Sequence, residues 1–168
     1  RYQGHEAKII MCVDVTTSSQ HRHELETALQ AEAVLNETVQ ILYAEQELEK
    51  ALDLMLAHMG LYLRADRCLI LSVDGGAMNC AHEWCRQGIE SRKGAYQDLP
   101  LKSIERWQDA LARHNNILIP DCTLMADTYP EEYAFLTKLQ IKNCVAAPIL
   151  IRDNLVSILI VTNLPPEE

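Results

Sequence analysis

Hydrophobic and polar residues alternate along the first part of the chain, from Ala7 to Val15. A repeat of two over this length predicts a half-buried β-strand. A second signal follows, because Thr17-Ser-Ser-Gln20 has the spacing of a helix N-terminal capping box. No glycine or proline occurs between Gly4 and Gly60, so a helix can extend over most of residues 18–40.

Two hydrophobic stripes with helical spacing lie in this long segment. The first, which Glu32 interrupts, consists of Leu25, Ala28, Leu35, Val39 and Leu42. The second consists of Leu48, Leu52, Met55, Leu56 and Met59. Gly60 follows as the expected C-cap of the second helix. A hydrophobic stripe on a helix needs a covering partner, so we expect the first stripe to form a parallel homodimer through the N-terminal helix.

Beyond residue 66 the pattern becomes that of strands and short helices. Residues 68–73 form a hydrophobic run, and Asp74-Gly75-Gly76 is a hairpin signal before a second strand at 79–86. The later segments predict a loop at 87–98, a helix capped by Ser103, a strand at 116–120, a helix opened by Thr128 and Pro130, and strands at 144–151 and 155–162 joined at Asp153-Asn154. This order predicts an α+β fold, with helices packed on the faces of an antiparallel sheet, preceded by a long N-terminal helix.

Charge and composition narrow the classes of function. Lys and Arg number 15 against 24 Asp and Glu, a net charge of −9, and seven glutamates with no Lys or Arg lie between Glu24 and Glu49. Such a field repels phosphate backbones, so neither nucleic acid nor an anionic membrane surface is an expected partner. The longest hydrophobic run, Cys144 to Ile151, is far shorter than the roughly 20 residues of a membrane span, so no insertion into a membrane is expected.

The cysteines and the start of the chain bear on where the protein works. None of the 6 cysteines forms a C-x-x-C pair, and a chain of 168 residues can build a core without disulfides. Reduced thiols are therefore expected, which favours a cytoplasmic location. The chain begins at Arg1, with neither an initiator methionine nor a signal peptide, and we interpret it as a piece of a larger protein.

Four segments in this order resemble a GAF domain. They are Arg67-Cys-Leu-Ile-Leu-Ser-Val-Asp74, Glu83-Trp-Cys85, Ile117-Leu-Ile-Pro-Asp121 and Gln140-Ile-Lys-Asn-Cys-Val-Ala-Ala-Pro148. The resemblance covers residues 36–165 and implies the GAF fold. Gln140 stands where the family often has glycine, and Asn154 stands where the last hairpin often has one.

The first sixteen residues resemble the last strand of a PAS domain, which commonly precedes a linker helix. Together the resemblances divide the chain into a PAS-like remnant at 1–17, a linker or signalling helix at 18–40 and a GAF domain at 41–168. They imply a regulatory sensor module of a larger bacterial protein, such as a diguanylate cyclase or phosphodiesterase of cyclic-di-GMP signalling or a sensor histidine kinase of a two-component system. The fragment itself is expected to bind an unidentified small ligand or to mediate dimerisation and relay, without being an enzyme.

A ligand of such a module needs a concave pocket beside the sheet. Alternation along the second strand puts His82, Trp84 and Arg86 on one face, where they suit a planar or anionic ligand. Trp107 and the pair Asp121-Cys122 complete the candidate site. Packing of both tryptophans in the core is the competing interpretation. The sequence identifies no cofactor, and its histidines lack the spacing of a metal site.

Other activities of GAF domains require residues that can be sought in the sequence. A free methionine sulfoxide reductase needs an activated and a resolving thiol, for which Cys80, Cys85 and Cys122 are the candidates. The PAS-like start does not suit a free-standing enzyme of that kind. The Cys-His pair associated with bilin attachment and the Asn-Lys…Phe…Asp-Glu pattern associated with cyclic nucleotides are both missing.

Overall fold

The computed structural model describes residues 28–34, 36, 37, 40 and 48–165 of the chain. Two compact units are distinguished, Arg1–Gln40 and Ile41–Glu168. All the described residues of the first unit are helical. The predicted PAS-like strand and capping box lie outside the described residues. No described helix is both long and hydrophobic enough to cross a membrane.

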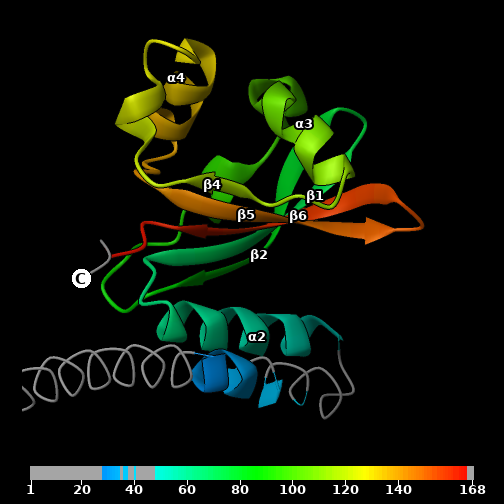
Figure 1. Ribbon diagram of the computed structural model, residues 1–168, viewed down its shortest axis with the longest axis vertical. Coiled ribbons are helices and arrows are strands. Elements are labelled where there is room, and N and C mark those ends of the chain that lie inside the picture. Colours follow the sequence, from blue (N-terminus) through cyan, green and yellow to red (C-terminus); the bar gives the residue numbers. More distant parts are fainter. Residues whose placement is uncertain (1–27, 35, 38–39, 41–47, 166–168) are drawn as a thin grey trace, which may run out of the picture. The chain divides into compact units, whose positions relative to one another are not determined.

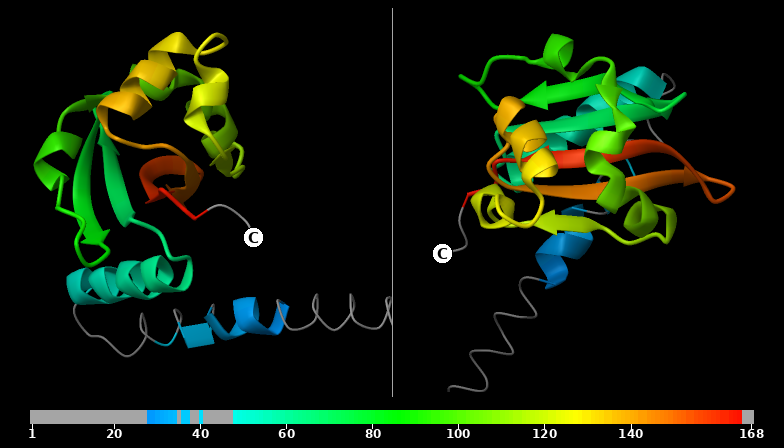
Figure 2. Two further views of the ribbon diagram at one scale, coloured as in Figure 1. Left: turned by 90° about the vertical axis from the view of Figure 1, so that its left-hand side faces the viewer. Right: turned by 90° about the horizontal axis from the view of Figure 1, so that it is seen from above.

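Within residues 48–165, a curled six-stranded antiparallel sheet forms the centre of the second unit (Figures 1 and 2). Its strands lie in the order β3-β2-β1-β6-β5-β4. Their bounds are β1 Arg67–Asp74, β2 Ala77–Cys85, β3 Leu99–Pro100, β4 Ile117–Ile119, β5 Cys144–Ile151 and β6 Asn154–Thr162. The α+β fold class predicted from the sequence is confirmed, and the four long strands lie within two residues of their expected bounds.

The two hairpin turns depend on backbone conformations that few residues adopt. Gly75 and Gly76, between β1 and β2, have φ angles of 56° and 86°. In the β5–β6 hairpin the turn residues are Arg152 and Asp153, with φ of 48° and 64°, and not the predicted Asp153-Asn154. A type I′ turn requires two successive residues with positive φ, which Arg152 and Asp153 supply. Asn154 pairs with Ile151 and therefore already belongs to β6.

Helices cover both faces of the sheet. Helix α2 (Leu48–Tyr62) packs on one face, and helices α3 (Glu105–Ala112) and α4 (Pro130–Lys138) lie on the other (Figure 1). Under α2 is a small hydrophobic cluster of Met55, Leu56, Ala65, Cys68, Ile70 and Val161. The larger core lies between the sheet and α3 and α4, and it contains Trp107 and Tyr96. Three short 3₁₀ helices complete the described unit: η1 Lys93–Tyr96, η2 Leu101–Ile104 and η3 Cys122–Met125.

Gly60 lies inside α2, so its predicted role as the C-cap is wrong. The helix continues to Tyr62, and the residue with positive φ is Arg64, at 52°. The structure gives another reason for the glycine, because a Cβ at this position would overlap the benzene ring of Trp84. The missing side chain lets the indole of β2 pack directly on the backbone of α2.

The predicted start is wrong at one of the two short helices and right at Pro130 of the other, where the cap residue is Tyr129 and not Thr128. Ser103 lies in η2, and α3 begins at Glu105 with Ile104 in the cap position, so Ser103 is not the N-cap. Helix α4 begins at Pro130 as predicted and buries Leu136. Proline suits the first turn of a helix because its missing N–H has no partner there in any case.

An irregularity in β2 changes which of its residues share a face. Pairing between β1 and β2 shifts between Ile70 and Leu71, so that Ala81 is an extra residue in β2. Before it, Met78 belongs to the core beneath α3 and α4, whereas Trp84 after it packs in the cluster under α2. The predicted placement of His82 and Trp84 on one face is therefore confirmed, and the alternation along β2 is broken at Ala81, between Cys80 and His82.

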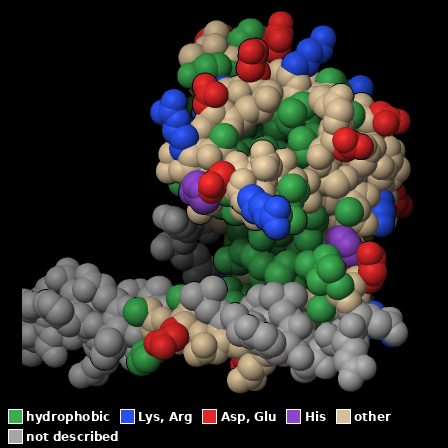
Figure 3. Space-filling model, turned by 90° about the vertical axis from the view of Figure 1, so that its right-hand side faces the viewer, with side chains coloured by type: hydrophobic (Ala, Val, Ile, Leu, Met, Phe, Trp, Pro, Cys, Tyr) green, Lys and Arg blue, Asp and Glu red, His purple; other side chains and the backbone are tan. Residues whose placement is uncertain are grey.

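Some hydrophobic side chains reach the surface. Leu118 on β4, Leu124 on η3 and Ile151 at the end of β5 are 71%, 77% and 61% exposed. Figure 3 shows hydrophobic side chains gathered in the middle of one side of the molecule, with charged side chains mainly around the edge. Single exposed hydrophobic residues are ordinary for a folded domain and assign no function by themselves.

Candidate functional site

An open pocket of about 580 Å³ lies at the end of the sheet where β1 begins and β6 ends. We call it the sheet-end pocket. Its walls are Asp66 and Arg67 before and at the start of β1, the segment 88–95 after β2, Gln140 after α4, and Asn163 after β6. Most of these residues are polar or charged. Its size falls within the range of about 300–1,000 Å³ that is usual for small-molecule sites.

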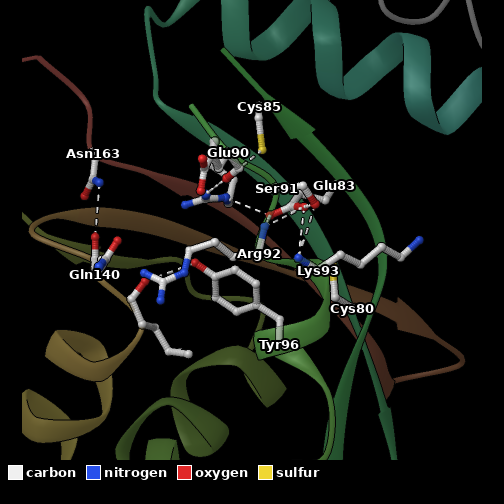
Figure 4. A network of polar contacts seen from close by, with 12 residues as sticks. Cys80, Glu83, Cys85, Glu90, Ser91, Arg92, Lys93, Tyr96, Gln140 and Asn163 are labelled. Carbon is white, nitrogen blue, oxygen red and sulfur yellow. Dashed lines mark hydrogen bonds and ion pairs between the residues drawn. The ribbon is translucent and has the colours of Figure 1, made fainter. Parts of the chain in front are cut away.

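Glu83 on β2 holds the segment that forms one wall of this pocket (Figure 4). Its side chain is only 2% exposed, and its carboxylate accepts hydrogen bonds from the hydroxyl of Ser91 and from the N–H groups of Arg92 and Lys93, both at 3.1 Å. Burial alone would raise the pKa of Glu83, but these hydrogen bonds and the charge of Arg67 outweigh it, so the pKa lies below its ordinary value. The ionised carboxylate therefore anchors the segment at neutral pH.

Arg67 lies beneath the same segment and is 4% exposed. Its Nε is 2.7 Å from Oε1 of Glu83, and its Nη2 donates to the carbonyl oxygen of Glu90 at 2.6 Å. The guanidinium also lies over the ring of Tyr96, with 5.7 Å to the centroid. Burial lowers the pKa of Arg67, but the neighbouring Tyr96, Cys85 and Glu83 raise it to a net value above the ordinary one. The charge of Arg67 is thus paired within the protein.

Arg92 differs from Arg67 because its guanidinium has no such pairing. Its Nη1 is buried without a hydrogen-bond partner. None of the ion pairs found within the described part of the chain includes Arg92. Burial raises the pKa of Tyr96, and the charges of Arg67 and Arg92 act in the opposite direction, which places the Arg92 guanidinium near the phenol. A half-buried, unpaired cation therefore lies on the wall of the pocket.

Asn163 fastens the opposite wall. Its Nδ2 donates to the carbonyl oxygen of Gln140 at 3.2 Å, and its Oδ1 accepts from the N–H of Lys142 at 2.8 Å. Gln140 and Asn163 both have positive φ, 59° and 54°. The left-handed conformation explains why glycine suits the Gln140 position, as the sequence comparison with GAF domains suggested.

The interior between the sheet and α3 and α4 is filled by the protein's own side chains. The cavity that remains there has a volume of about 10 Å³ and is lined by hydrophobic and aromatic residues. Trp107 and Tyr96, each 1% exposed, border it. Small-molecule sites usually need about 300 Å³ or more, so this interior has no room for a ligand of that size.

The structure separates the residues that the sequence predicted to line one pocket. His82 and Trp84 face α2, where Nδ1 of His82 lies 2.8 Å from the carboxylate of Asp53. Arg86 follows β2 and pairs with Asp66, which lines the sheet-end pocket. Within the predicted set, only Arg86 therefore comes close to that pocket.

The other predicted residues lie on the far side of the sheet. Trp107 is in the core, and its Nε1 donates to Oε1 of Glu132 at 2.7 Å. Cys122 is buried and donates from Sγ to the carbonyl oxygen of Ile141, whereas Asp121 is exposed and caps η3 by accepting from the N–H of Thr123. Both tryptophans thus pack in hydrophobic clusters, as the competing interpretation predicted. A ligand-binding role for any of the six stays a prediction.

Sequence reasoning missed the residues that build the sheet-end pocket. In the sequence, Arg67 stands out as the start of a GAF-like segment and Glu83 as part of Glu-Trp-Cys. The sequence predicts a loop at 87–98, and the signal in it is that two glycines and the charged residues Glu90 and Lys93 flank Arg92. What the sequence did not reveal is that Glu83 and this segment meet.

The three candidate cysteines of the described residues are not activated thiols. Burial raises the pKa of Cys80 to about 12 and also raises the pKa values of Cys85 and Cys122, with nearby carboxylates adding to the effect. These thiols are therefore protonated at neutral pH. Among the described residues, no group of three or more His, Cys, Asp or Glu side chains is arranged to hold a metal ion.

Comparison with known proteins settles the family. Residues 47–168 match the GAF domain family. The chain belongs to the GAF family. No curated protein matches its sequence. The family match agrees with the order of strands and helices described above.

Solved structures with this fold include several GAF domains of phytochromes. A phycocyanobilin-bound GAF domain from a cyanobacterial phytochrome is 19% identical, with a TM-score of 0.66 and 82% of each chain covered. The chromophore-binding domain of a bacteriophytochrome from R. palustris is 14% identical, with a TM-score of 0.66, 84% of this chain and 54% of that chain covered. The wild-type chromophore-binding domain of Stigmatella aurantiaca phytochrome P1 is 12% identical, with a TM-score of 0.66, 82% of this chain and 52% of that chain covered. At these identities the similarity establishes the fold alone.

Proposed function

We propose that this GAF domain is the sensory module of a larger bacterial signal-transduction protein, such as a diguanylate cyclase, a cyclic-di-GMP phosphodiesterase or a sensor histidine kinase. It binds a small ligand in the sheet-end pocket and passes the binding event to α2. Membership of the GAF family supports a sensor role. The pocket supports ligand binding, because its size and its polar lining suit a small molecule.

The observation that carries the proposal is that β2 contacts both the pocket wall and α2. Glu83 holds the pocket wall through Ser91 and Arg92, and the next residue, Trp84, packs against Gly60 of α2. Consecutive side chains of a strand lie on opposite faces of the sheet. A displacement of Glu83 when the pocket is filled therefore moves Trp84 against α2.

His82 adds a polar contact to the same strand-to-helix interface. Its Nδ1 lies 2.8 Å from the carboxylate of Asp53, and its Nε2 lies 3.6 Å from that of Glu49. Packed interfaces of this kind switch between discrete arrangements, and helix shifts of about 1–2 Å are a common form of such switching. Strand β2 is thus suited to pass a change in the pocket to α2.

The alternative function, reduction of free methionine sulfoxide by Cys80, Cys85 and Cys122, has less support. That chemistry needs a thiolate, and the raised pKa values of all three thiols disfavour one at neutral pH. We expect no methionine sulfoxide reduction by the wild-type chain in an assay with free methionine sulfoxide and a thiol reductant. Robust turnover that is lost when all three cysteines are replaced by Ser would establish the alternative instead.

The relay is tested by hydrogen exchange of the Glu83→Gln variant. The substitution keeps the shape of the side chain and removes the charge that holds Arg67 and the wall segment. We expect faster amide exchange in the segment 88–95 and also in α2, because the two regions are joined through β2. The matched control is Asp109→Asn, which removes an exposed carboxylate on α3 and should leave both regions unchanged.

Two outcomes would contradict the relay. One is faster exchange in the segment 88–95 with α2 unchanged, which would mean that the pocket wall opens independently. The other is an equal increase in every element, including β5 and β6, which would mean a general loss of stability. Only a change shared by the wall segment and α2, with β5 protected as in the wild type, agrees with the proposal.

A further inference from the structure

We infer that the ligand of the sheet-end pocket carries a carboxylate or phosphate group, and that the Arg92 guanidinium binds it. The inference rests on the proposed function, since it names the chemistry that the same pocket recognises.

The charged side chains near the pocket are paired within the protein or exposed to water, with one exception. Arg67 is paired with Glu83, and Arg86 is paired with Asp66. No ion pair within the described residues includes Arg92 or Glu90, and of these two Glu90 is exposed to water. Arg92 is therefore the lining residue whose charge is both partly withdrawn from water and unmatched.

The buried Nη1 of Arg92 strengthens this conclusion. An N–H group taken out of water without a partner costs free energy, and the cost is larger when the group carries charge. The buried Nη1 is itself closed to a ligand, but Arg92 is only half-buried and lines the pocket, so a ligand oxygen on its exposed part would balance the unmatched charge. Carboxylate and phosphate oxygens match the planar fork of donors that arginine presents and form charge-assisted hydrogen bonds with it.

The surroundings limit the charge of the ligand. Glu90 lines the same pocket, and the chain as a whole has a net charge of −9. Both oppose the approach of a polyanion. We therefore expect one anionic group on an otherwise polar and uncharged body, small enough for a pocket of about 580 Å³.

Binding of matched pairs of probes tests the inference. One pair is succinamate and its uncharged counterpart succinamide; the other is glycerol 3-phosphate and glycerol. Titration calorimetry at low ionic strength should detect binding of the anionic member of at least one pair and no binding of its uncharged member. The pair that responds distinguishes a carboxylate from a phosphate.

Variants of Arg92 locate the binding. Loss of a hydrogen-bonded charge weakens binding by about 10- to 100-fold, so Arg92→Gln should show that decrease. Arg92→Lys, which keeps the charge, should bind more tightly than Arg92→Gln. The matched control Arg113→Gln removes an exposed arginine at the end of α3 and should bind like the wild type. Thermal unfolding of each variant confirms that it is folded.

Three results would overturn the inference. They are equal binding of the charged and uncharged probes, unchanged binding by Arg92→Gln, and no binding of either anion. None of these results tests whether a change in the pocket wall reaches α2. The exchange experiment with Glu83→Gln tests that without a ligand. Failure of the inference and failure of the proposed function are therefore distinguishable.

Discussion

Gly60 of α2 and Trp84 of β2 pack directly against each other. The indole of Trp84 lies where a side chain at position 60 would be, so helix and strand approach each other through a glycine. A glycine inside a helix normally costs stability relative to alanine. Its presence here is explained by the packing of Trp84 and not by any requirement of the backbone, since its φ is that of the helix.

The Gly60→Ala substitution should therefore destabilise the protein. Better helix propensity would contribute about 1 kcal/mol of stability, but overpacking against Trp84 costs about 1–3 kcal/mol and should dominate. Urea denaturation measures the difference in the free energy of unfolding. The matched control is Gly94→Ala, because a Cβ at position 94 meets no atom within 4 Å, and it should be neutral or slightly stabilising. A more stable Gly60→Ala variant would contradict this account of the contact.

At the residue scale, the sequence shows which charged and aromatic side chains are present. It does not show which of them contact one another. Glu83 contacts residues 8 to 10 positions further along, and Arg67 contacts Glu90 at a separation of 23 positions. The pattern of residues within one segment does not show which distant residue a side chain will contact. The predicted set around Trp84 and Trp107 failed to converge for the same reason, since the two tryptophans lie on opposite faces of the sheet.

The two helices above the sheet are joined by Glu132. This buried carboxylate of α4 accepts from Nε1 of Trp107 at 2.7 Å and from Nη2 and Nε of Arg106 at 2.8 and 3.1 Å. Arg106 also lies over the ring of Tyr129, 4.7 Å from the centroid. The hydrogen bonds to Glu132 raise the pKa of Arg106. The contacts hold α3 against α4 above the filled interior.

Replacement of Glu132 by Gln should destabilise the protein by about 1–3 kcal/mol, because hydrogen bonds to a buried charge are lost or weakened. Glu131→Gln is the matched control, since Glu131 is the exposed neighbour on the same first turn of α4. Its effect should be a few tenths of a kcal/mol, from the helix dipole alone. Equal free energies of unfolding for the two variants would show that the Glu132 contacts contribute nothing to stability.

The wall segment of the sheet-end pocket should respond to acid. The pKa of Glu83 is lower in the folded protein than its ordinary value, so its ionisation stabilises the fold. This contribution is fully present above the ordinary glutamate pKa of about 4.3 and is lost as the pH falls through the lowered folded pKa. We expect the segment 88–95 to gain amide exchange in that acidic range, and Glu83→Gln to remove the dependence. An identical pH dependence in Glu83→Gln would assign the effect to other carboxylates.

At the element scale, pattern and turn chemistry predicted the long strands and both short helices above the sheet. A hydrophobic run followed by the Gly75-Gly76 turn placed β1 and β2, and hydrophobic runs placed β5 and β6. The two-residue β3 and the extra residue Ala81 were missed, because neither has a repeating signature. That one extra residue decides which side chains of β2 face the core beneath α3 and α4 and which face α2.

The association of whole chains is a prediction that concerns mainly residues outside the described part. The stripe from Leu25 to Leu42 should form a parallel homodimer, since each buried Leu or Val contributes about 1.5–3 kcal/mol. The seven glutamates between Glu24 and Glu49 repel one another across the interface, and salt screens them over about 8 Å at physiological ionic strength. The dimer should therefore become tighter as salt rises. Analytical ultracentrifugation at several salt concentrations measures this, and a monomer throughout or a dimer weakened by salt would refute it.

At the scale of the whole molecule, the order of segments was enough to assign the fold, and the position of the ligand site was not. Filling of the interior depends on how Trp107, Tyr96 and their neighbours pack, which a single sequence does not specify. The sheet-end pocket arises where four separate segments meet at one end of the sheet. Such a place can be found only when the fold is known.

The position of a bound ligand tests the central claim most directly. The measurement is a crystal structure of the chain with the anion that binds most tightly in the probe experiment. We predict that the anion lies between the segment 88–95 and Asn163, with its oxygens on the Arg92 guanidinium, and that Trp107 and Tyr96 still fill the interior. An anion bound between the sheet and α3 and α4, with those aromatic side chains displaced, would contradict the account.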